Sequence, residues 1–234
     1  MIEIQFYGVL QEVAGKRSTS FPLEEPTALV EVLERLQEQL PGLAAHMPRL
    51  ACAIDDEIVP RTHTIEPGAT LALLPPVSGG CRSIAMTVSR HLQSEPFDIM
   101  RLLEETENDA SGALVVFSGT VRNHHDGKEV VKLEYSAHRA LVEKVLAELE
   151  QEVIEKFGVH RCRIVHREGT LNIGEDSVLI VVRAGHRPEA FEAARYAIDT
   201  LKKRAPIWKR EHYADGSVVY QDGEQLVPEE RSAD

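Results

Sequence analysis

The string Pro75–Gly80 (PPVSGG) divides this chain into two parts. Adjacent prolines cannot continue a hydrogen-bonded strand, and adjacent glycines carry no side chains that could pack. Such a string is typical of a linker between folded units. We therefore predict a first domain over residues 1–80 and a second domain over residues 81–234, each long enough to bury its own core.

The residues ahead of this string predict a small sheet with one helix. Apolar positions alternate from the N-terminus onward, and the first two expected strands would form a hairpin around Ala14-Gly15. Apolar residues then recur at helical spacing from Thr27, the expected N-cap, to Leu40. The expected strands cover residues 2–10, 17–23, 50–54, 57–60 and 70–75. The resulting order, ββαββ, is that of the β-grasp or ubiquitin-like fold.

The residues after the string have a different pattern of apolar positions and predict an α+β domain. Gly112–Val121 is a continuous apolar run, which predicts a buried central strand. Two long helices are expected over 138–157 and 188–204, the second of which must stop before Pro206. The other expected elements are a short helix over 97–106 and strands over 83–91, 129–136, 161–168, 177–184, 207–213 and 217–221.

Composition excludes several classes of function. The net charge of −12 argues against broad nucleic-acid binding, which needs a basic face. No apolar run approaches the roughly 18 residues that a membrane span needs. The N-terminus lacks the basic and apolar segments of a secretory signal, so we expect a cytoplasmic protein. The three cysteines, Cys52, Cys81 and Cys162, have no metal-type spacing and suit a reducing compartment.

Three clusters of polar residues follow or join the expected elements. Val121–His125 follows the apolar strand on a loop, where sites are often built, although a solvated loop fits it equally well. In Ala184–Pro188, His186 and Arg187 either sit beside a helix N-terminus that suits an anion or merely cap a turn. Lys202–Arg210 holds five cations in nine residues. A solvated helix end is the plainer interpretation of this stretch, and a small anionic ligand or an acidic tail is the alternative.

Taken together, the clusters offer many hydrogen-bond donors and no matching acids. The candidate residues are Arg122, His124, His186, Arg187, Lys202 and Lys209. Such a set suits a phosphate and a polar heterocycle. It does not suit a metal, because histidine pairs at ligand spacing and nearby thiolates or carboxylates are missing. Lys202 and Lys209 cannot be assumed to share one helical face, since Pro206 breaks the helix between them.

Several long strings resemble one known enzyme. LLPPVSGG at 73–80 is similar to the C-terminus of the small subunit of molybdopterin synthase, a β-grasp sulfur carrier. Three further strings resemble the large subunit of the same enzyme, whose domain has an α/β-hammerhead fold. They are FSGTVRNHHDG at 117–127, VHREGTL at 165–171 and AGHRPEAFEAARYAIDTLKKRAPIWKRE at 184–211. The two resemblances cover almost the whole chain, in that order.

The resemblance implies sulfur transfer in molybdenum cofactor biosynthesis. In this family the terminal glycine of the carrier is adenylated by an activating enzyme and receives sulfur from a donor as a thiocarboxylate. The tail then enters a pocket of the large subunit and gives two sulfurs to cyclic pyranopterin monophosphate (precursor Z), forming the dithiolene of molybdopterin. No permanently bound cofactor or metal is implied. The large subunits form dimers, so we expect a homodimer through the catalytic domain.

The matched strings carry the family's functional residues onto particular positions. Gly79 and Gly80 would form the sulfur-carrier tail. Lys202 is the best candidate for the catalytic residue next to Gly80, and Lys209 is a second catalytic or anion-holding group. Lys203 follows Lys202 directly, but the spacing to the RAPIWK string selects Lys202. The substrate-binding candidates are Arg122, His124, His186 and Arg187.

One departure from the family bears on mechanism: Gly80 is followed by Cys81, so its carboxyl is held in a peptide bond. The favoured hypothesis is proteolysis after Gly80, which frees the carboxyl for charging. A second hypothesis is attack of the Cys81 thiol on the Gly80 carbonyl, giving a thioester. A third is that the fusion acts as a scaffold and another carrier delivers the sulfur. Two further alternatives are a carrier fusion serving another sulfur pathway and a non-catalytic interaction module.

Overall fold

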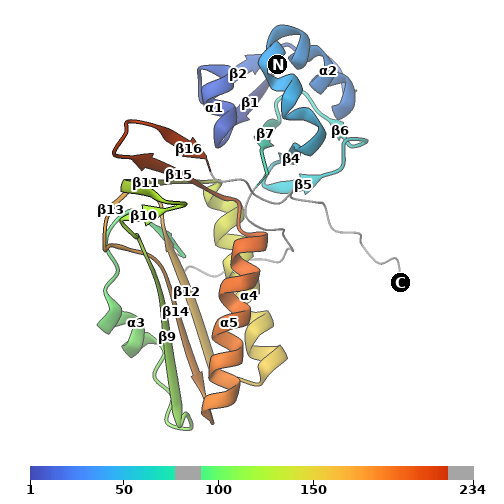
Figure 1. Cartoon of the computed structure of the whole chain (residues 1–234). Helices are drawn as coiled ribbons and strands as arrows, with labels where there is room; N and C mark the ends of the chain where they lie inside the picture. The colour runs from blue at the N-terminus through green and yellow to red at the C-terminus, as the bar shows by residue number, and fades with distance from the viewer. Residues whose placement is uncertain (77–90, 221–234) are drawn as a thin grey trace.

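The computed structural model describes residues 1–76 and 91–220. Two bodies are joined in the chain, an N-terminal one and a larger C-terminal one (Figure 1). Gly79, Gly80, Cys81 and all but the last residue of the strand expected over 83–91 lie outside the described residues. Among the described residues, no helix combines the length and the apolar composition that crossing a membrane requires.

The N-terminal body has the β-grasp architecture that the sequence predicts. Its sheet has the order β2-β1-β7-β4-β5, in which β1 and β7 run parallel and the other neighbours run antiparallel. Helix α2 (Leu29–Gln39) supplies buried Leu29, Val32, Leu33 and Leu36 to the core of this sheet. The strands are β1 (Ile2–Phe6), β2 (Ser18–Phe21), β4 (Ala51–Ile54), β5 (Glu57–Val59) and β7 (Thr70–Leu74). Smaller elements are the strand pair β3 (Thr27–Ala28) and β6 (Thr64–Ile65) and the 3-10 helices η1 (Pro41–Ala45) and η2 (Met47–Arg49).

The expected hairpin around Ala14-Gly15 is wrong, because a helix separates β1 from β2. The first strand stops at Phe6, and Gly8 follows with φ 53° and ψ −135°, a backbone conformation that side chains disfavour. Helix α1 (Val9–Ala14) buries Leu10 and ends at Gly15, which adopts the left-handed conformation. Thr27 is not the N-cap of α2, since it belongs to the short strand β3.

The C-terminal body is built on a four-stranded sheet of order β8-β12-β14-β9. Helices α4 (Arg139–Phe157) and α5 (Arg187–Arg204) cover one face, and their apolar side chains form the largest core with β12 and β14. The short helix α3 (Ile99–Glu105) packs Leu102 on the opposite face. The strands are β8 (Leu92–Gln93), β9 (Ala113–Thr120), β12 (Arg161–Arg167) and β14 (Asp176–Ala184).

The apolar run expected to form a central strand lies instead at an edge of this sheet. Strand β9 pairs only with β14 among the described residues, and its side chains alternate between half-buried and exposed. Leu114 and Val116 are 42% and 40% exposed. The prediction of a buried central strand was therefore wrong. An apolar run indicates that a strand is at least partly buried, but it does not indicate which strands pair with it.

A second sheet, of order β10-β11-β15-β16 with β13 also paired to β11, adjoins the first. After Pro206 ends α5, the chain turns back as β15, which pairs with β11 from Ala137↔Ile207 to Val130↔Tyr213. The strands are β10 (His124–His125), β11 (Lys128–Ala137), β13 (Gly169–Asn172), β15 (Ile207–Tyr213) and β16 (Val218–Tyr220).

The two bodies meet at a domain interface centred on Trp208 of β15. Trp208 is buried with Leu141 against small residues of the N-terminal sheet, and its indole Nε1 donates a 3.1 Å hydrogen bond to the carbonyl of Pro75. The ring of Tyr7 lies between the two domains, with its centroid 4.9 Å from that of His138 and 5.6 Å from that of Trp208. This contact fixes the end of β7, and with it the last described residues of the first domain, beside α5 and β15.

Candidate active site

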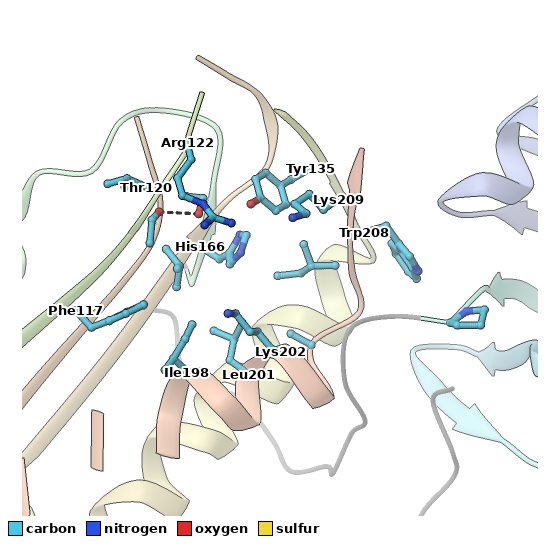
Figure 2. A pocket seen from close by; sticks show the side chains of 16 residues that line it. Phe117, Thr120, Arg122, Tyr135, His166, Ile198, Leu201, Lys202, Trp208 and Lys209 are labelled. Carbon is cyan, nitrogen blue, oxygen red and sulfur yellow. Dashed lines mark hydrogen bonds between the residues drawn. The ribbon is translucent and has the colours of Figure 1, made fainter. Parts of the chain in front are cut away.

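A cavity of about 580 Å³ opens where the C-terminal end of α5 faces β15 and the ends of β9 and β12. Figure 2 shows side chains from these elements pointing into one space. Pro76 lines this cavity as well, so the first domain contributes to its wall. The other lining residues are Phe117, Gly119, Thr120, Arg122, Tyr135, His166, Ser177, Val178, Ile198, Leu201, Lys202, Ala205, Ile207, Trp208 and Lys209.

The last turn of α5 distinguishes between the two adjacent lysines. Lys202 points into the cavity from this turn, whereas Lys203 is not among the lining residues (Figure 2). Arg204 turns away from the cavity and pairs with Glu152 of α4. The break at Pro206 then returns the chain so that Lys209 faces the cavity from β15. Lys202 and Lys209 thus meet across the cavity although they share no helix.

Lys209 is held by a buried acidic residue. Its ammonium nitrogen lies 2.9 Å from Oε1 of Glu211, whose side chain is 3% exposed. Oε2 of the same carboxylate lies 2.8 Å from Nδ1 of His125 and accepts a 2.5 Å hydrogen bond from the Tyr213 hydroxyl. Burial alone would raise the pKa of Glu211, but the hydrogen bonds from Tyr213 and Lys209 outweigh it and lower the pKa. Glu211 therefore stays ionised and forms an ion pair with Lys209.

The loop after β9 holds two candidate substrate-binding residues, and one of them lines the cavity. Arg122 extends over the cavity from above in Figure 2 and is exposed at its rim. His124 is exposed and is absent from the cavity lining; its Nδ1 lies 2.9 Å from the side-chain oxygen of Asn123. The neighbouring His125 instead contacts Glu211 beneath the loop.

His186 and Arg187 lie at the opposite end of α5 from Lys202. His186 is the N-cap of the helix and Arg187 its first residue, and both are exposed. Fifteen residues of α-helix separate Arg187 from Lys202, a rise of about 22 Å along the axis. Within one chain these two candidates therefore do not reach the cavity that holds Arg122, Lys202 and Lys209.

Comparison with known proteins identifies both halves. Residues 4–80 match the ThiS family, and residues 92–204 match the family described as MoaE protein. The molybdopterin synthase catalytic subunit of Nostoc sp. is 46% identical over 126 residues, which cover 53% of this chain and 76% of that relative. The corresponding subunit of Pyrococcus abyssi is 36% identical over 144 residues, or 62% of this chain and 97% of the relative. The chain belongs to the molybdopterin synthase catalytic subunit family.

A solved structure agrees with this assignment. The crystal structure of molybdopterin synthase from Staphylococcus aureus superposes with a TM-score of 0.54 at 38% identity, covering 58% of this chain and 98% of that chain. Membership of the molybdopterin synthase family, together with the ThiS match, supports a role in molybdenum cofactor biosynthesis. The boundary placed at Gly80 stays a prediction, because residues 77–90 lie outside the described part of the chain.

Several residues that line the cavity of this molybdopterin synthase family member were not predicted from the sequence. His166 and Tyr135 face the cavity and pack edge to face, with ring centroids 5.1 Å apart (Figure 2). Trp208 forms the side of the cavity nearest the first domain. His166 and Trp208 stand inside strings quoted for the family resemblance, so those strings held the signal. Tyr135 lies on β11, where an alternating strand pattern gives no indication that its face borders a cavity.

Proposed function

We propose that this chain is a molybdopterin synthase in one polypeptide. Its first domain would carry sulfur as a thiocarboxylate on Gly80, and its second would transfer two sulfurs to cyclic pyranopterin monophosphate. The observation that carries the proposal is that Pro76 and Lys202 line the same cavity. Gly80 is four residues beyond Pro76, a reach of at most about 14 Å for extended chain. In this proposal a tail of that length brings the Gly80 carboxyl into the cavity that Pro76 lines.

The proposed chemistry fits the residues of the cavity. Glycines without side chains leave a terminal carbonyl accessible in a confined space. Fixed cations stabilise the charge that develops when sulfur is transferred and the cyclic phosphate opens. In this proposal Lys202 stabilises that charge or moves a proton next to Gly80. Lys209, held in position by Glu211, binds the anionic group, and Arg122 binds phosphate at the rim.

The role proposed for His124 in binding substrate stays a prediction, since this residue is not in the cavity lining of its own chain. The roles proposed for His186 and Arg187 require a second copy of the chain. The two α5 residues would reach the cavity of a partner protomer in the expected homodimer. Support comes from the exposed apolar side chains of edge strand β9, Leu114 and Val116, since such strands pair readily with another chain. In this arrangement each active site would draw cations from two protomers.

Charging of Gly80 requires its carboxyl to be released from the bond to Cys81. We propose proteolysis after Gly80, followed by adenylation by an activating enzyme and sulfur transfer from a donor. Intact-mass analysis of active protein from its native host should then show two fragments. A purely full-length species in active enzyme contradicts cleavage and favours the thioester or the scaffold alternative. Full activity of Cys81→Ser would exclude the thioester.

The proposed function is tested by reconstitution with an activating enzyme, a sulfur source and cyclic pyranopterin monophosphate. A molybdopterin synthase makes a dithiolene that activates an apo-molybdoenzyme, whereas a carrier for another sulfur pathway or a scaffold does not. Lys202→Ala should abolish dithiolene formation while the fold is retained. Lys203→Ala is the matched control, because it removes the adjacent charge outside the cavity lining and should keep its activity. Normal turnover by Lys202→Ala would remove this lysine from the mechanism.

A further inference from the structure

A buried histidine, His166, gives this cavity a chemical feature that its cations do not have. His166 is at the end of β12, where it pairs with Val178 of β14. Its exposed fraction is 5%, yet it lines the cavity and its ring lies between Arg122 above and Lys202 below (Figure 2). It is therefore a polar side chain enclosed by protein and directed at the space where substrate would bind.

The protonation of the His166 ring follows from its surroundings. Nδ1 lies 2.8 Å from the backbone oxygen of Arg167, and a carbonyl oxygen only accepts, so Nδ1 carries the hydrogen. Burial lowers the pKa of His166 to about 4, which keeps the ring neutral near pH 7. In a neutral imidazole with hydrogen on Nδ1, the other nitrogen, Nε2, holds a lone pair and can only accept.

The orientation of this acceptor is fixed from both sides. The ring packs edge to face on Tyr135, with an angle of 76° between the two planes. Arg167, whose carbonyl binds Nδ1, is anchored through its guanidinium to the carbonyl of Ser94 and to Glu175. Among the residues that the structure describes, none provides a hydrogen-bond donor to Nε2.

A hydrogen-bond acceptor that borders the cavity and has no protein partner among the described residues constrains the ligand. Leaving it unpaired in a complex costs free energy, so a good ligand donates an N–H or O–H group to it. The nearby cations Arg122, Lys202 and Lys209 are donors themselves and favour an anionic group on the same ligand. The cavity thus suits a molecule that carries both a phosphate and a hydrogen-bond donor. A bare phosphate or polyphosphate satisfies only half of this requirement.

We propose that Nε2 of His166 accepts a hydrogen bond from a ring N–H of the reduced pterin and so orients the heterocycle relative to Lys202. This inference rests on the proposed function and specifies which part of the substrate this side of the cavity recognises. The cations hold the phosphate, and His166 distinguishes the pterin from other phosphate esters. His166 is a substrate-binding residue that transfers no proton in this scheme.

The test compares His166→Phe with His166→Gln. Phenylalanine keeps a ring and removes the acceptor, whereas the glutamine side-chain oxygen can accept from roughly the position of Nε2. Binding is measured by calorimetry for two probes, cyclic pyranopterin monophosphate and inorganic phosphate. His166→Phe should weaken precursor binding about tenfold to a hundredfold. Phosphate binding should be unchanged, and His166→Gln should recover part of the precursor affinity. In turnover, KM for the precursor should rise more than kcat falls.

Three results with the variants would overturn the proposal. Precursor binding by His166→Phe equal to wild type would show that Nε2 makes no substrate contact. An equal loss of precursor and phosphate binding would show that the variant disturbs the cations. Failure of His166→Gln to improve on His166→Phe would assign the effect to packing. If the wild-type protein itself bound phosphate but not precursor, the proposed function would fail, and this inference with it.

Discussion

Replacement of Gly8 by alanine tests whether the two domains are docked in solution as they are in the structure. Gly8 has φ 53° and ψ −135°, and a Cβ added there would lie 3.0 Å from both Cγ of Pro75 and Cγ of Trp208. Backbone strain of this kind costs about 1–3 kcal/mol. The forced contact with the indole adds about 1–3 kcal/mol, as other overpacked sites do. We expect the forced contact between the added methyl group and the Trp208 indole to weaken the domain interface.

The assay uses the fluorescence of Trp208, which is the only tryptophan of the chain. Because Trp208 is 4% exposed when docked, any loosening of the domain interface should shift its emission to longer wavelength under native conditions. Gly15→Ala is the matched control. Gly15 also has a positive φ, of 66°, but nothing lies within 4 Å of the added Cβ, so this variant carries strain without the contact.

Gly8→Ala should therefore shift the emission and lower the free energy of unfolding in urea by about 2–6 kcal/mol. Gly15→Ala should leave the emission unchanged and cost only about 1–2 kcal/mol. The reasoning is refuted if folded Gly8→Ala protein has the wild-type emission maximum, since Trp208 would then not be packed on Gly8 in solution.

Two further predictions concern buried groups. Glu211→Gln should lower the free energy of unfolding at pH 7 by about 1–3 kcal/mol, because it removes a buried, hydrogen-bonded carboxylate. Since the folded state lowers the pKa of Glu211, its stabilisation is present above the ordinary value of 4.5 and is lost as pH falls through the lowered pKa. The difference from wild type in urea titrations should shrink below pH 4.5, and a constant difference would contradict this assignment. Burial raises the pKa of Cys52 to about 12 and also raises that of Cys162, so neither thiol should react with a disulfide reagent at pH 8 until the protein unfolds. Peptide mapping after labelling of the native protein measures this directly, and rapid modification of either residue would show that its site opens.

Local patterns in the sequence predicted most elements of the fold. Helical spacing placed α2, and Pro206 marked where α5 must stop. Turn residues placed the hairpin of β4 and β5, where Asp55 and Asp56 adopt positive φ angles. Elements whose limits depend on tertiary context were missed. Helix α1 replaces the end of an expected strand because Gly8 turns the backbone against Trp208, a residue 200 positions further along the chain.

The residues of the candidate site were likewise predictable from the sequence only in part. The family strings selected Lys202 over Lys203, and α5 places only Lys202 at the cavity. That Lys209 would face Lys202 could not be predicted, because it depends on the direction in which β15 leaves Pro206 and pairs with β11. His166 was missed for a related reason. It reads as an ordinary residue near the end of a buried strand, and only the packing of β12 against neighbouring elements brings its ring into the cavity.

The position of Trp208 ties the arrangement of the domains to the enclosure of the reaction space. One side of its indole borders the cavity, while the other packs on the first domain and binds the Pro75 carbonyl. Pro76 closes the same wall. If the first domain acts as the proposed sulfur carrier, its departure for reloading would open this wall and admit water to the cavity. Under that proposal, exchange of the carrier and release of the product would be one physical event.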